Sequence, residues 1–129
     1  MERFLVICLG GAIGTGLRYV TSGVAARWLG ADFPYGTLIV NVVGSFLIGL
    51  IQHVGTASLL IPETTRLFLT VGIMGGLTTY SSFSYETIRL AQVGAWGQAW
   101  VNVLVTTSLC LGVCFLGIAA GRLIVGVRV

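Results

Sequence analysis

The segment at residues 75–85 places hydroxyl groups and aromatic rings where a membrane helix would be apolar. It begins with two adjacent glycines, Gly75 and Gly76, and continues as Leu-Thr-Thr-Tyr-Ser-Ser-Phe-Ser-Tyr. Apolar residues on both sides extend the segment to the length of a membrane span. Where the backbone departs from helical geometry inside the hydrocarbon, its N–H and C=O groups lose their hydrogen-bond partners, at a cost of several kcal/mol for each group. Such a break survives only inside protein or beside water or an ion, so the segment is predicted to be a site.

Polar side chains in two other apolar segments extend the candidate site. Asn41 follows Thr37 by one helical turn, and Asn102, Thr106 and Cys110 recur at a spacing of four residues. Polar groups inside a membrane usually face the interior of a bundle or a water-filled cavity. This favours a pore-lining role for Asn41, whereas the alternative is a hydrogen bond that joins two helices.

The chemistry of these groups favours binding of an anion over catalysis. Hydroxyl O–H, amide N–H and the edge of an aromatic ring all present partial positive charge. Such donors suit a small, strongly hydrated anion, because they replace the water that it loses. No carboxylate pair or Ser-His-Asp set is present, since the only histidine, His53, lies near the end of an apolar segment. The glycine-rich run at 10–16 has the wrong order for a dinucleotide-binding motif, so the sequence predicts a protein that is not an enzyme.

The composition predicts an all-α membrane protein. Of the 129 residues, 56% are hydrophobic and 9% are charged, whereas a soluble domain averages roughly 25% charged residues. A helix crosses the hydrocarbon in roughly 20 residues, so the chain has room for four spans in a single domain, residues 1–129. We expect transmembrane helices at about 4–28, 36–54, 65–93 and 98–123, with a break in the third near 75–79. The net charge of +3 comes from arginines near span ends, where they would meet lipid headgroups, and it does not indicate nucleic-acid binding.

The arginines give only a weak signal for orientation. Four lie on the side of both termini, at positions Arg3, Arg66, Arg122 and Arg128. The other side holds Arg27 and Arg89, with Arg18 as a further candidate. Because the bias in Lys and Arg sets orientation, the chain is predicted to insert both ways up. A small protein with both orientations can pair with an inverted copy of itself, which predicts a dual-topology, antiparallel homodimer.

Two stretches, 36–49 and 75–84, resemble the two signatures of the CrcB/Fluc fluoride channels, and the run from Gly10 to Arg18 also matches. The resemblance covers the whole chain. It implies a dual-topology homodimer in the cell (inner) membrane, with two pores that export fluoride passively and so lower its toxicity in the cytoplasm. It also implies a structural Na⁺ at the centre of the dimer.

The resemblance also implies roles for individual residues. These are Na⁺ binding by the backbone carbonyls of Gly75 and Thr78, a pore amide at Asn41, a pore aromatic pair at Tyr80 and Phe83, and a vestibule arginine at Arg18. Tyr80 departs from the phenylalanine that is usual in the family. The remaining candidates for contact with fluoride are the polar side chains Thr37, Ser81, Ser82, Asn102 and Thr106.

Two other classes of membrane protein are alternatives. A small proton-coupled multidrug-type transporter needs a carboxylate in its first span, and residues 4–28 contain none. A non-conducting structural protein would explain the Gly-x-x-x-Gly spacings at Gly10 and Gly14 and at Gly117 and Gly121, which let helices approach closely. It would not explain a hydroxyl-rich break.

Overall fold

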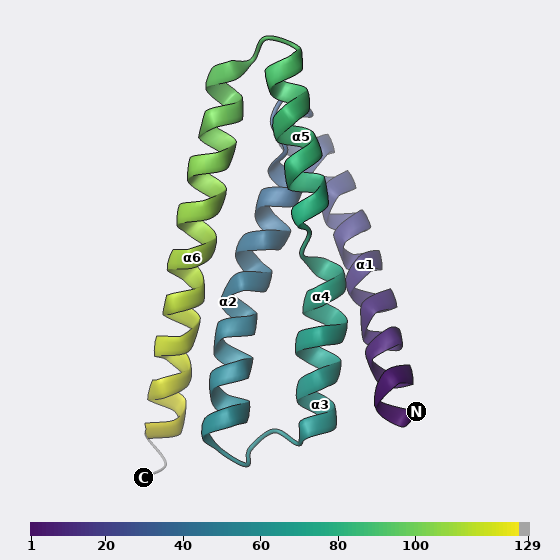
Figure 1. Ribbon diagram of the computed structural model, residues 1–129, viewed down its shortest axis with the longest axis vertical. Coiled ribbons are helices and arrows are strands. Elements are labelled where there is room, and N and C mark those ends of the chain that lie inside the picture. The colour runs from purple at the N-terminus through teal and green to yellow at the C-terminus, as the bar shows by residue number, and fades with distance from the viewer. Residues whose placement is uncertain (127–129) are drawn as a thin grey trace.

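A computed structural model describes residues 1–126 of the chain, and within this range every regular element is helical. The elements are α1 (Glu2–Leu29), α2 (Tyr35–Ala57), α3 (Glu63–Leu67), the π-helix η1 (Phe68–Met74), α4 (Gly75–Leu77), α5 (Tyr80–Gln92) and α6 (Trp96–Gly126). Three of them, α1, α2 and α6, are long and apolar enough to cross a membrane. The elements from α3 to α5 follow one another as a fourth rod (Figure 1). The predicted all-α fold with four helical segments is confirmed, and three of the segments could cross a membrane. That the interrupted third segment also crosses stays a prediction, and Arg128 lies outside the described residues.

The four rods lie side by side, and the interrupted one changes its packing partner along its length. Helix α2 packs along α6, whereas α1 packs against η1 and α4. Beyond the break, α5 packs against α6 instead (Figure 1). Helix α1 begins and α6 ends at the same end of the molecule (Figure 1). The break is therefore the point at which the third segment passes from α1 to α6.

Glycines on both sides bring the backbone of α1 against η1 and α4. A Cβ atom added at Gly14 would collide with the carbonyl oxygen of Ile73, and one added at Gly76 would collide with that of Gly11. At Gly10 an added Cβ would lie 2.7 Å from the Phe68 carbonyl oxygen. Small residues permit such close approach between membrane helices. The close packing expected from the Gly10 to Gly14 spacing is confirmed.

The π-helix η1 was not expected from the sequence, which predicted a regular helix here. At the end of η1, the N–H of Gly75 donates a hydrogen bond to the carbonyl of Thr70, five residues back, which is the π-helical spacing. One turn earlier, the hydroxyl of Thr70 donates to the Arg66 carbonyl at 2.7 Å. Such a bond from a threonine hydroxyl to the carbonyl four residues back often bends a helix. Short π-helical turns inside α-helices are frequent at functional sites, and this one is separated from the break only by the short helix α4.

The break itself is shorter than predicted. Residues 75–77 remain helical, and only Thr78 (φ −80°, ψ 156°) and Thr79 (φ −155°, ψ 123°) adopt extended backbone. Thr79 is the N-cap of α5, because its side-chain oxygen accepts the N–H of Ser82 at 3.2 Å. Capping by threonine starts a new helix at once, which limits the interruption to two residues.

We expect Gly14→Ala to destabilise the protein, because the new methyl group would force apart the backbones of α1 and η1. Overpacking of this kind costs about 1–3 kcal/mol. Gly16→Ala is the matched control, since a Cβ there meets nothing within 4 Å and alanine is favoured over glycine in a helix by up to about 1 kcal/mol. Thermal unfolding in detergent should show a lower midpoint for Gly14→Ala alone. Equal midpoints for the two variants would contradict the described packing.

Candidate functional site

Asn41 binds the interrupted backbone with both atoms of its side-chain amide. Its Nδ2 donates to the carbonyl of Thr79 at 3.0 Å, and its Oδ1 accepts the N–H of Thr79 at 2.8 Å. The side chain comes from the second turn of α2, and Asn41 is only 9% exposed. A buried polar group left without a partner costs about 1–3 kcal/mol. One side chain therefore satisfies both backbone groups of the residue at which the helix is interrupted.

The hydrogen bonds at the break leave two carbonyl oxygens without their usual helical donors. In a continuous helix, the N–H of Thr79 would donate to the carbonyl of Gly75, and that of Ser82 to the carbonyl of Thr78. Here these two N–H groups donate to Asn41 and to the Thr79 hydroxyl. Within residues 1–126, no hydrogen bond reaches the carbonyl oxygens of Gly75 or Thr78. The two carbonyls predicted to bind a cation are thus among those that the break leaves without donors.

A pocket of about 550 Å³ lies beside the break, between α2, α4, α5 and α6. Of the predicted site residues, it brings together Asn41, Gly75, Thr78, Tyr80, Phe83 and Thr106. No carboxylate, histidine or basic side chain lines it. An amide nitrogen carries two hydrogens, so Asn41 keeps one N–H beyond the hydrogen bond that it donates to Thr79.

The two predicted pore aromatics differ in their surroundings. Phe83 is 8% exposed, whereas Tyr80 is 80% exposed. Their ring centroids lie 5.5 Å apart, with an angle of 55° between the ring planes. The two rings are therefore tilted relative to each other rather than stacked face to face, and the edge of an aromatic ring carries partial positive charge.

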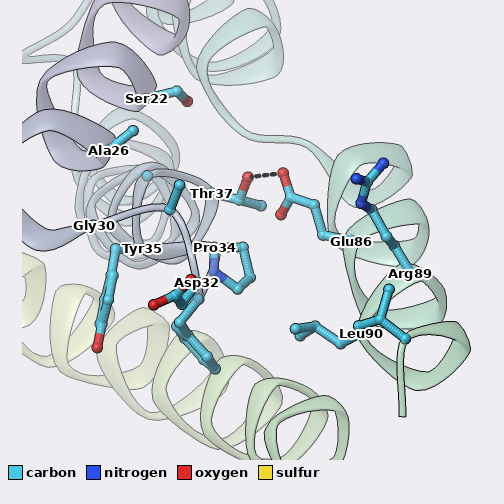
Figure 2. Close-up of a pocket in the computed structure, with 14 residues that line it drawn as sticks. Ser22, Ala26, Gly30, Asp32, Pro34, Tyr35, Thr37, Glu86, Arg89 and Leu90 are labelled. Carbon is cyan, nitrogen blue, oxygen red and sulfur yellow. Dashed lines mark hydrogen bonds between the residues drawn. The ribbon is translucent and has the colours of Figure 1, made fainter. Parts of the chain in front are cut away.

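Thr37 lies in a different pocket, of about 420 Å³, near the connection between α1 and α2 (Figure 2). Its hydroxyl donates to Glu86 Oε1 at 2.9 Å. The second carboxylate oxygen of Glu86 is buried and has no hydrogen-bond partner within the described part of the chain. Glu86 was not among the predicted site residues. The signal that could have identified it is that it is the only carboxylate in residues 65–93.

Four further predicted site residues lie outside the lining of the larger pocket. Arg18 is partly buried on α1, and its Nε donates to the carbonyl of Gly76 at 3.0 Å. Ser81 is exposed and Ser82 is partly buried, at the start of α5. Asn102 is 2% exposed and is hydrogen-bonded to neighbouring threonines. Direct contact of these residues with an ion stays a prediction.

Replacing Asn41 with leucine should destabilise the protein, because both backbone groups of Thr79 would lose their partners. We expect a loss of about 1–3 kcal/mol for each group and faster hydrogen exchange at the Thr79 amide. Ile39→Leu, at a more exposed position on the same helix, serves as the control and should change neither quantity. Unchanged stability and unchanged exchange at Thr79 in Asn41→Leu would contradict the described contact.

Comparison with known proteins places the whole chain in one family. Residues 5–118 match the family model described as "CrcB-like protein, Camphor Resistance (CrcB)". A relative from Anaeromyxobacter dehalogenans, named "Fluoride-specific ion channel FluC", is 50% identical over 115 residues, which cover 89% of this chain and 91% of the relative. A relative with the same name from Geobacter sp. is 48% identical over 122 residues, which cover 95% of this chain and 98% of the relative. Another from Sorangium cellulosum is 49% identical over 127 residues, which cover 98% of this chain and 100% of the relative. Because the match extends from α1 through the break and into α6, this multi-pass membrane protein belongs to the CrcB family.

Proposed function

We propose that the protein is a fluoride-specific ion channel that lets fluoride leave the cytoplasm passively across the cell (inner) membrane and so lowers fluoride toxicity. The names of the relatives support fluoride as the ion. The observation that carries the proposal is the break at Thr78 and Thr79, held by Asn41 beside a pocket that no acidic or basic side chain lines. Such a pocket offers a path for an ion and contains no carboxylate or histidine for acid–base catalysis.

The lining of the pocket suits a small anion. The remaining N–H of Asn41 and the ring edges of Tyr80 and Phe83 offer partial positive charge. Fluoride is small enough to approach such donors closely, whereas the larger chloride gains less from them because electrostatic attraction falls with distance. The absence of carboxylate and histidine from the lining favours passive movement over proton coupling. It also provides no support for a multidrug-type transporter.

A second copy of the chain, inverted in the membrane, would complete the path. Tyr80 and Gly75 line the pocket and are exposed in the single chain. Carbonyl groups without partners cannot face hydrocarbon at low cost, so this face needs a cover of protein or water. The weak arginine bias supports insertion in both orientations. We therefore assign an antiparallel homodimer, with the break of each subunit close to the dimer axis.

A structural Na⁺ fits the carbonyls that the break leaves free. Two inverted subunits would contribute the Gly75 and Thr78 carbonyls of each, which makes four neutral oxygen ligands. Oxygen ligands suit a hard cation, and neutral dipoles suit a monovalent ion better than Ca²⁺, which takes more ligands and usually carboxylates. The positive charge would also offset the partial negative charge of carbonyls beside an anion path.

Purified protein in liposomes should release fluoride rapidly, while chloride release stays at the level of empty liposomes. Ion-selective electrodes measure both rates. Phe83→Ile should slow fluoride release severely, because it removes a ring from the pocket lining. Phe115→Ile is the matched control, since Phe115 is 67% exposed on α6 and lies outside the pocket. Comparable release of fluoride and chloride would refute the proposed selectivity.

Leu59→Cys, in a background without Cys8, Cys110 and Cys114, should react with a membrane-impermeant thiol reagent from both sides of the membrane. Leu59 is fully exposed in the connection between α2 and α3. Labelling from both sides follows if the chain inserts in both orientations. Labelling from one side only, in vesicles that release fluoride, would refute the antiparallel dimer but leave the channel function standing.

A further inference from the structure

Behind the pocket, a continuous chain of hydrogen bonds connects α6 to α5. The hydroxyl of Thr106 donates to Asn102 Oδ1 at 3.2 Å, and Asn102 Nδ2 donates to Thr87 Oγ1 at 2.8 Å. The hydroxyl of Thr87 then donates to the backbone carbonyl of Phe83 at 2.7 Å. Asn102 is 2% exposed, so water does not compete for its amide. We call these four residues the α5–α6 chain.

The direction of the α5–α6 chain is set at its Phe83 end. A backbone carbonyl can only accept, so the hydroxyl hydrogen of Thr87 is used there and its oxygen accepts from the NH₂ group of Asn102. The amide oxygen of Asn102 then faces Thr106, whose hydroxyl must donate to it. The opposite amide orientation of Asn102 would place its oxygen against that of Thr87 without a hydrogen between them.

This direction has a consequence for the pocket. Thr106 and Phe83 line the pocket, whereas Asn102 and Thr87 do not. Because the single hydroxyl hydrogen of Thr106 is used in the bond to Asn102, this side chain has no O–H left to donate to an ion in the pocket. At the other end, the chain ties the turn of α5 that carries Phe83 to α6.

We propose that Thr87 and Asn102 are positioning residues for ion movement: without touching the ion, they hold Phe83 in place and set the direction of the Thr106 hydroxyl. The inference rests on the proposed channel function. It gives Asn102 a role different from direct contact with fluoride. It also assigns a role to Thr87, which lies outside the pocket.

The test compares fluoride release and thermal unfolding for Thr87→Val, Asn102→Leu and the double variant. Thr87→Ser keeps the hydroxyl and serves as the rescue variant, and Thr87→Ala replaces Thr87→Val if the valine variant does not fold. Thr56→Val is the matched control. The Thr56 hydroxyl donates to the Gln52 carbonyl at 2.7 Å, four residues back, as that of Thr87 does to Phe83, but Thr56 has no partner on another helix within the described residues.

We expect Thr87→Val to slow fluoride release several-fold, with Thr87→Ser and Thr56→Val near the wild-type rate. The double variant should be no slower than Asn102→Leu, because both changes interrupt the same chain. A wild-type rate in Thr87→Val, or slowing in the double variant equal to the product of the single effects, would overturn the inference.

Thermal unfolding separates this inference from the proposed function. If the wild-type protein releases no fluoride, the proposed function fails. The α5–α6 chain still predicts that the losses in unfolding midpoint of Thr87→Val and Asn102→Leu add to more than the loss in the double variant. Additive losses would then overturn the inference.

Discussion

The two hydrogen bonds between Asn41 and Thr79 allow a helix to be interrupted inside a hydrophobic bundle. A side-chain amide has the same donor and acceptor as a peptide group, so it can replace the helical partners that Thr79 lacks. Without such a replacement, an extended residue at membrane depth would leave its N–H and C=O without partners, at a cost of several kcal/mol each. The other features of the site depend on this replacement of helical hydrogen bonds by a side-chain amide. They are the free carbonyls at Gly75 and Thr78, the change of packing partner at the break, and the pocket next to it.

Each side of the break is attached to a different helix by a different kind of contact. Before the break, glycines bring η1 and α4 against the backbone of α1, and Arg18 donates to the carbonyl of Gly76. After the break, the α5–α6 chain attaches α5 to α6 through buried side-chain hydrogen bonds. Close backbone packing resists rotation of the first half, and directional hydrogen bonds restrain the second. The two extended residues are therefore held between two attached segments.

The charged side chains near the bundle interior have polar partners away from the larger pocket. Arg18 is bonded to a backbone carbonyl, and Glu86 accepts from Thr37 in the smaller pocket. A full charge on the path would bind an ion of opposite sign too tightly to release it, or would repel one of the same sign. Neutral donors beside the break provide attraction without either effect. This separation of charges from the larger pocket is consistent with passive movement of an anion.

The sequence by itself determined the four helical segments, their approximate ends and the position of the interruption. Length and hydropathy suffice for this because a helix satisfies its own backbone in hydrocarbon, so each segment can be recognised locally. Adjacent glycines followed by hydroxyl side chains are also a local signal. Only the tertiary structure decided that the interruption covers just Thr78 and Thr79, that a π-helix precedes it, and which groups meet across the bundle. The pairs Asn41 and Thr79, Arg18 and Gly76, and Asn102 and Thr87 are separated by 38, 58 and 15 residues. Whether such residues meet depends on how far each helix is rotated about its axis, and that rotation is set by packing against its neighbours rather than by its own sequence.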